Sequence, residues 1–139
     1  MTAITTTRPV TTTHRRIASV GLWTLQVVLA VTYAFAAFGK LSADPAAIAG
    51  FEAMGLGTAG MYIIGTLELA GAIAMFVPRL TGLAAACFVA LMIGAVAFTL
   101  AMGGGGAMVA FPAAVGVVAA VVAWGRREST RRLIAQLHH

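Results

Sequence analysis

The chain has 139 residues, of which 60% are hydrophobic and only 9% are charged, whereas an ordinary soluble domain carries about 25% charged residues. This composition excludes an ordinary soluble domain and indicates one compact membrane domain. The net charge of +5 does not indicate nucleic-acid binding, because every basic residue except Lys40 and Arg79 lies in one of the two tails rather than along a soluble face.

The N-terminal part of the chain divides into a polar tail and a long apolar run. Residues 1–16 are rich in threonine and arginine and have almost nothing to bury, so we expect a disordered cytoplasmic tail. Residues 17–38 would rise about 33 Å as a helix, which is enough to cross a bilayer. We therefore predict the first membrane span over residues 17–38.

Polar side chains recur at intervals of seven along this first span and its end. Gln26, Tyr33 and Lys40 follow this spacing, so they share one helix face that must meet protein rather than lipid. Two interpretations remain open at this point. The face either makes ordinary hydrogen bonds between helices or lines a cavity for a ligand or a proton.

Hydrophobicity falls between residues 39 and 60. Asp44 followed by Pro45 is typical of a helix start, with an N-cap and a proline at the first helical position. A short helix is predicted over residues 45–54, and glycines then break it. Three of its side chains are expected to dip into the membrane interface: Ile48, Phe51 and Met54.

The second predicted span, residues 61–77, contains one carboxylate, Glu68, in an otherwise uncharged run. A charge at the centre of a spanning helix costs roughly 2.5–3.5 kcal/mol on insertion scales and usually marks a pathway, a site or a buried pair. Gly65 and Ala72 flank Glu68 on the same face, so another helix can approach closely. Pro78 is predicted to end the span in a tight reversal.

The remaining spans are predicted over residues 80–100 and 107–124. The third carries small residues at spacings of four, which are typical of close packing within the bundle or between protomers: Gly82, Ala86, Ala90 and Gly94. The single cysteine, Cys87, excludes an internal disulfide and is expected to be a small buried apolar side chain. Residues 125–139 form a basic cytoplasmic tail that could contain an amphipathic helix.

Orientation follows from the basic residues. Eight arginines lie on one side of the four predicted spans and only Lys40 lies on the other. The positive-inside rule therefore places both termini in the cytoplasm, with residues 39–60 and 103–106 facing outward.

This topology brings the polar residues of the spans together. Tyr33 and Glu68 are each about 10 Å below the outer end of their helix, and Lys40 lies above both, where its ammonium group can reach the carboxylate. We therefore expect a candidate functional or ligand-binding cluster of Glu68, Lys40 and Tyr33, with Gln26 deeper in the membrane. No metal site is expected, and no catalytic residue is assigned.

Three stretches carry a resemblance to a known family: FAAFGKL at residues 35–41, FEAMG at 51–55 and GTLELAG at 65–71, with Pro78 closing the span. They resemble the DoxX and DoxX-like family of small bacterial membrane proteins, whose lysine at the end of the first helix and glutamate in the second match Lys40 and Glu68. The resemblance implies an all-α four-helix membrane bundle. The family's namesake is similar to a small subunit of a thiosulfate:quinone oxidoreductase, and other members are associated with oxidative-stress or sulfur-handling complexes.

Three functions follow as hypotheses. The first is an accessory subunit of a membrane-associated oxidoreductase or stress-related complex in the bacterial cytoplasmic membrane, in contact with quinone or lipid. The second is a stand-alone binder, carrier or enzyme for a small lipophilic molecule, using the Glu/Tyr/Lys cluster. The third is a purely structural membrane protein. The bilayer, a partner membrane or peripheral protein and a second copy of the chain are the expected partners, and nucleic acid is not. The chain has no histidine in its spans and no cysteine pair, so the resemblance alone does not make it a redox enzyme.

Overall fold

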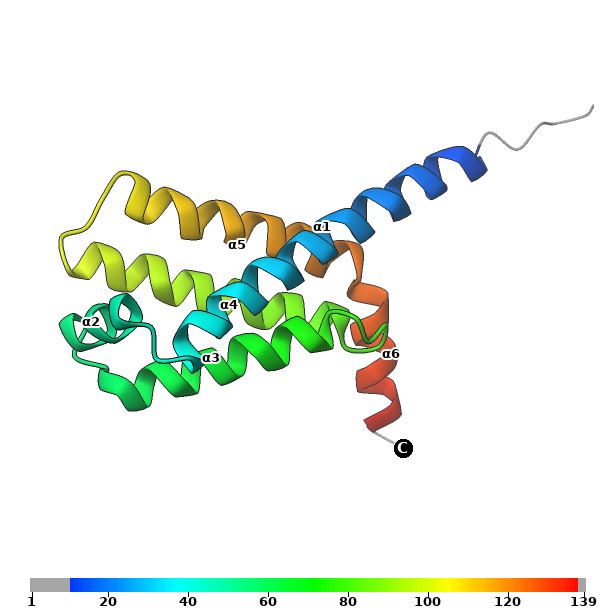
Figure 1. The fold of residues 1–139 in the computed structure, drawn as a ribbon. Helices are drawn as coiled ribbons and strands as arrows, with labels where there is room; N and C mark the ends of the chain where they lie inside the picture. Colours follow the sequence, from blue (N-terminus) through cyan, green and yellow to red (C-terminus); the bar gives the residue numbers. More distant parts are fainter. Residues whose placement is uncertain (1–10, 138–139) are drawn as a thin grey trace, which may run out of the picture.

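The computed structural model describes residues 11–137, and every regular element in that part of the chain is a helix (Figure 1). The helices are α1 (Thr11–Leu41), α2 (Pro45–Ala53), α3 (Gly57–Ala74), α4 (Thr81–Ala101), α5 (Ala107–Gly125) and α6 (Arg127–Leu137). Helix α1 begins within the tail that was predicted to be disordered, while residues 1–10 and the terminal histidine pair lie outside the described residues.

Four of these helices are long and apolar enough to cross a membrane: residues 17–41 of α1, and all of α3, α4 and α5. The prediction of an all-α protein with four membrane-spanning helices is therefore confirmed. The boundaries differ by a few residues, most clearly for α3, which begins and ends earlier than predicted. They carry large exposed apolar side chains, such as Phe35 and Phe111, as expected for surfaces that face lipid.

The four spans are arranged as two well-packed pairs. Helix α3 packs along α1, and α4 packs along α5, whereas contact between α3 and α4 is sparse. Glycines allow close approach within and between the pairs: a Cβ at Gly116 of α5 would lie 3.1 Å from the Met92 Cβ of α4. One buried cluster joins the pairs, made of Leu29, Ala30, Tyr33, Ala72, Met75, Ala84, Ala85, Phe88, Ala119 and Val122.

The short helix α2 lies across one end of the bundle (Figure 1). Its predicted start is confirmed, because the Asp44 carboxylate accepts a hydrogen bond of 2.8 Å from the Ala46 amide. It ends in a Schellman motif around Gly55, whose φ of +71° suits glycine. Phe51 was expected to dip into the interface. It is instead 7% exposed, on a helix that packs against α3.

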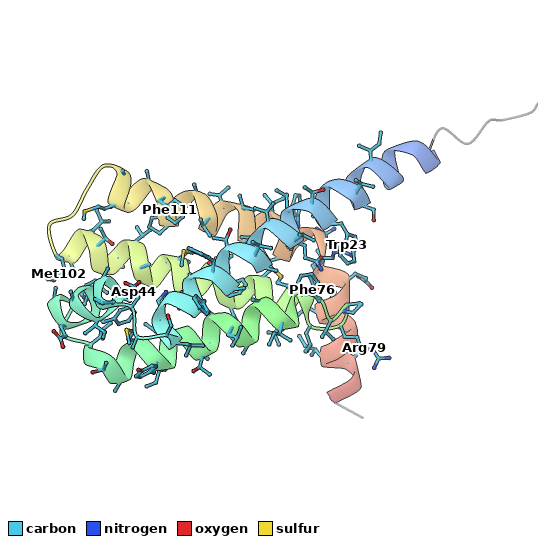
Figure 2. The ribbon with its side chains drawn as sticks, viewed as in Figure 1. Trp23, Asp44, Phe76, Arg79, Met102 and Phe111 are labelled. Carbon is cyan, nitrogen blue, oxygen red and sulfur yellow. The ribbon has the colours of Figure 1, made fainter. Side chains whose placement is uncertain are left out.

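Helix α6 crosses the opposite end of the bundle and contacts α4 (Figure 1). Figure 2 shows Arg79 at this end, while Asp44 and Met102 lie at the other. Here the Arg127 guanidinium lies over the Trp124 ring, 5.3 Å from its centroid. The separation of the arginines from Lys40 agrees with the charge pattern on which the predicted orientation rests, and the orientation stays a prediction.

Two expectations for α4 were wrong or incomplete. Cys87 was predicted to be buried and is exposed. Of the small-residue series, only Gly82 is buried, whereas Ala86, Ala90 and Gly94 are exposed. The reason is that α4 turns its opposite face to α5 and meets α3 only sparsely. No described helix of this chain covers Ala86, Ala90 or Gly94.

Candidate functional site

The charged centre of the molecule is an ion pair between α1 and α3. The Lys40 Nζ lies 2.8 Å from Glu68 Oε2 and 3.1 Å from Oε1, and it also approaches the Ala36 carbonyl oxygen at 3.4 Å. The two side chains are 17% and 6% exposed, respectively. The pairing expected from the sequence is therefore present, and the contact reduces the cost of placing a carboxylate in an apolar span.

Gly65 explains why α1 and α3 come close enough for this pair to form. A Cβ on Gly65 would lie 2.9 Å from the Lys40 Cβ and 3.3 Å from Leu41 Cγ, so any larger residue would push the helices apart. Glycine at this position lets the backbones approach, as small residues do between membrane helices. Residues 65 and 68 thus act together: one permits the contact and the other supplies the charge.

Tyr33 is 2% exposed and belongs to the buried cluster. It lies about one helical turn deeper than Glu68 rather than level with it, because Lys40 packs at Gly65 and the antiparallel register then places Tyr33 near Ala72. Its hydroxyl is buried and has no hydrogen-bond partner among the described residues, an arrangement that is costly.

Phe88 of α4 was not singled out by the sequence, yet it holds Tyr33 in place. The two rings are stacked, with centroids 3.6 Å apart and planes 3° from parallel. On α3, Gly71 receives the edge of the Phe88 ring, since a Cβ there would lie 2.6 Å from its Cε1 and Cζ atoms. The signal in the sequence was Gly71 itself, three residues after Glu68, but nothing local identified its partner.

Gln26 is not brought to the ion pair. Its Nε2 donates a hydrogen bond to the Met75 carbonyl at the end of α3, and the Thr81 hydroxyl donates to the same oxygen at 3.1 Å. Met75 is seven residues beyond Glu68, which corresponds to about 10 Å along a helix. Gln26 therefore fastens α1 to the turn between α3 and α4, while its own side-chain oxygen is buried without a partner in the described structure.

A cavity of about 510 Å³ opens beside the ion pair, within the size range of small-molecule sites. Lys40 and Glu68 are the charged groups on its wall. The rest of the lining comes from α2, α3, α4 and the α2–α3 turn: Phe51, Met54, Leu56, Ile64, Ala90, Leu91, Met92, Gly94, Ala95, Phe98 and Thr99.

This arrangement can bind a polar head in an apolar surrounding. The ion pair carries no net charge, and Lys40 is exposed enough for a hydrogen-bond acceptor to approach its ammonium group. The carboxylate is engaged by Lys40 through both of its oxygens, so nothing here marks Glu68 as a free base. Over residues 11–137 the structure contains no group of three or more His, Cys, Asp or Glu side chains that could hold a metal ion.

Residues 24–122 match the DoxX-like family, and this stretch contains all four residues of the predicted cluster. No curated protein and no solved structure matches the chain.

Proposed function

Since this chain belongs to the DoxX-like family, we propose that it is a small membrane protein that binds a lipophilic molecule with a polar head in the cavity beside Lys40 and Glu68. Quinones and lipids are the classes of molecule that fit this description. The bacterial cytoplasmic membrane is the location we propose for it.

One observation carries this proposal: a charged pair forms part of the wall of an otherwise apolar cavity of about 510 Å³. A pair that served only to fix helix register would be expected to be closed off by packed side chains. Here a turn of α2 and one face of α4 surround the pair and leave room for a molecule. The Tyr33 hydroxyl, which does not line the cavity, is buried without a partner in the described region and adds an unsatisfied polar group to the interior of the same bundle.

A second function is favoured by the exposed face of α4. Ala86 and Gly94 are small, exposed and uncovered by the described helices, which suits contact with another membrane protein. We therefore retain the role of accessory subunit of a membrane-associated oxidoreductase or stress-related complex. Purification in a mild detergent tests it: a membrane or peripheral protein that copurifies in constant ratio supports this role, and its absence argues for a stand-alone binder.

Binding to the cavity is tested with the purified protein in phosphatidylcholine nanodiscs. The probe is a fully substituted benzoquinone that carries a decyl tail. The double variant Lys40→Met/Glu68→Gln replaces the pair with neutral groups of similar size. We expect it to stay folded and to bind the probe on the order of tenfold more weakly, the loss produced by removing one good polar interaction.

Glu52→Gln is the matched control, because Glu52 is exposed on α2 and does not line the cavity. It should bind the probe as the parent does. If the double variant also binds as the parent does, the pair is a structural element and the third hypothesis, a purely structural protein, gains support.

A further inference from the structure

A second cavity lies next to the first, in the gap between α3 and α4. It has a volume of about 600 Å³, and it shares Ala90 and Leu91 with the cavity beside the ion pair. We call it the α3–α4 groove. Its lining carries no charged side chain: Leu67, Ala70, Gly71, Ala74, Leu80, Leu83, Ala84, Cys87, Phe88, Ala90 and Leu91.

The two cavities follow one another along the bundle axis. The first lies at the end covered by α2, where Lys40 ends the first span. The groove runs from there toward Ala74 and Leu80, next to the turn between α3 and α4 at the opposite end (Figure 1). A polar site near one surface of the bilayer is therefore followed by an apolar groove toward the bilayer interior. A membrane amphiphile has its polar head and apolar tail in the same order.

Several of the side chains that line the groove are small. On α3, Ala70 and Ala74 face it, and on α4 the exposed Cys87 and Ala90 do so. Phe88 also lines the groove, and its position is fixed because its ring is stacked on Tyr33 and packs against Gly71. Ala90, one member of the small-residue series that suggested a packed helix, thus lines an open groove.

We propose that the α3–α4 groove holds the single apolar tail of a neutral-headed amphiphile whose head lies at the Lys40–Glu68 pair. This inference rests on the proposed function and names its ligand class. A neutral head is favoured because the pair sums to zero, so a charged head would meet one attracting and one repelling group. One tail is favoured because the α3–α4 groove, which meets the head cavity at Ala90 and Leu91, has no charged side chain in its lining, whereas the cavity that meets the head site at Lys40, Phe51 and Met54 is also lined by Asp44.

The test compares two probes in phosphatidylcholine nanodiscs: the decyl-substituted benzoquinone and tetramethylbenzoquinone, which has a similar head and no tail. Cys87→Phe fills the groove from an exposed position without touching the ion pair. Ala97→Phe is the matched control, because Ala97 is exposed on the same helix but lines neither cavity. Comparison between variants removes the effect of the tail on partition into the bilayer, since that effect is common to all of them.

We expect Cys87→Phe to weaken binding of the decyl probe on the order of tenfold and to leave tetramethylbenzoquinone unaffected, while Ala97→Phe changes neither. Equal binding of the decyl probe by Cys87→Phe and the parent would overturn the tail assignment and leave the head site standing. If Lys40→Met/Glu68→Gln loses binding of both probes while Cys87→Phe binds both as the parent does, the result supports the head site and contradicts the tail site. Failure of both probes to bind the parent overturns the proposed function as well. A dimer in native mass spectrometry that Cys87→Phe disrupts would assign the groove to a helix of a second copy instead.

Discussion

At the scale of single residues, the ion pair of Lys40 and Glu68 links α1 to α3 inside the membrane. Buried pairs of this kind add little net stability, because desolvation of the two charges offsets most of their attraction. Removing one partner is costly, since the other charge is then buried alone. The presence of the pair is therefore better explained by the register it sets and the polar surface it gives the cavity than by stability.

The first prediction concerns this coupling. Lys40→Met leaves the Glu68 carboxylate buried without its cation and should destabilise the protein by about 3–5 kcal/mol. Glu68→Gln should cost less, because the 17% exposed lysine can reach more polar surroundings. The double variant should recover much of the loss, which thermal unfolding of all four proteins in one detergent would measure. Strictly additive losses would contradict direct coupling.

The second prediction concerns the packing of the Phe88 ring against Gly71. A methyl group at position 71 would overlap the Phe88 ring, so Gly71→Ala must displace that ring from its stack on Tyr33. We expect a loss of about 1–3 kcal/mol, typical of an overpacked core. Gly94→Ala is the matched control, because no heavy atom lies within 4 Å of the new methyl group. It should be neutral or stabilising in thermal unfolding, and an equally neutral Gly71→Ala would show that the ring moves freely.

At the scale of elements, the ends of the helices determine the direction in which the chain continues after each helix. Helices α1, α2 and α4 all end in the same pattern of hydrogen bonds, the Schellman motif, with a left-handed residue just past the end. In α2 and α4 this residue is glycine, Gly55 and Gly103. In α1 it is Ala43, whose φ is +56°. The turn at Ala43 directs the chain from Lys40 into α2 and so helps to form the cavity.

The third prediction follows from this difference. Alanine in the left-handed region costs roughly 1–2 kcal/mol, and glycine there costs the folded state little, although it loosens the unfolded chain. Ala43→Gly should therefore raise stability by up to about 1 kcal/mol, measured as an increase in Tm in detergent. The reverse change, Gly55→Ala, should lower Tm by a similar amount. A lower Tm for Ala43→Gly would show that the turn does not hold this conformation in the membrane.

At the scale of the whole molecule, the four spans form two helix pairs rather than one evenly packed bundle, and this arrangement determines where the cavities lie. Helices α1 and α3 carry the charges, and α4 and α5 form the second pair. Because contact between α3 and α4 is sparse, the gap between the pairs becomes the cavity and the groove. The cavity lies beside the Lys40–Glu68 pair, and the groove lies along the apolar part of the same gap.

The fourth prediction concerns orientation. In a Cys87→Ala background, a cysteine at Gly105 should react with a membrane-impermeant maleimide in intact cells, because the glycine loop is predicted to face outward. Gly105 is suitable because its site is open and its φ is not positive. Arg79→Cys is the matched control and should react only after cell disruption. The opposite pattern of labelling would reverse the predicted topology.

The sequence by itself determined the four spans and the short helix with its Asp44 cap, and it indicated that Lys40 can reach Glu68. These follow from properties that are local along the chain: the length of an apolar run, the residues at a helix start, and a carboxylate that requires a partner at its depth. The tertiary structure alone decided that Cys87 is exposed, that Phe88 stacks on Tyr33, that Gln26 binds at Met75 and that a groove lies between α3 and α4. Small residues recur on several faces of these helices, so their spacing indicates which surfaces can pack closely. Which of those surfaces meet depends on the rotation of each helix and on the packing of α3 with α1 and α4 with α5. An exposed face and a buried face can show the same spacing of small residues, so only the packing distinguishes them.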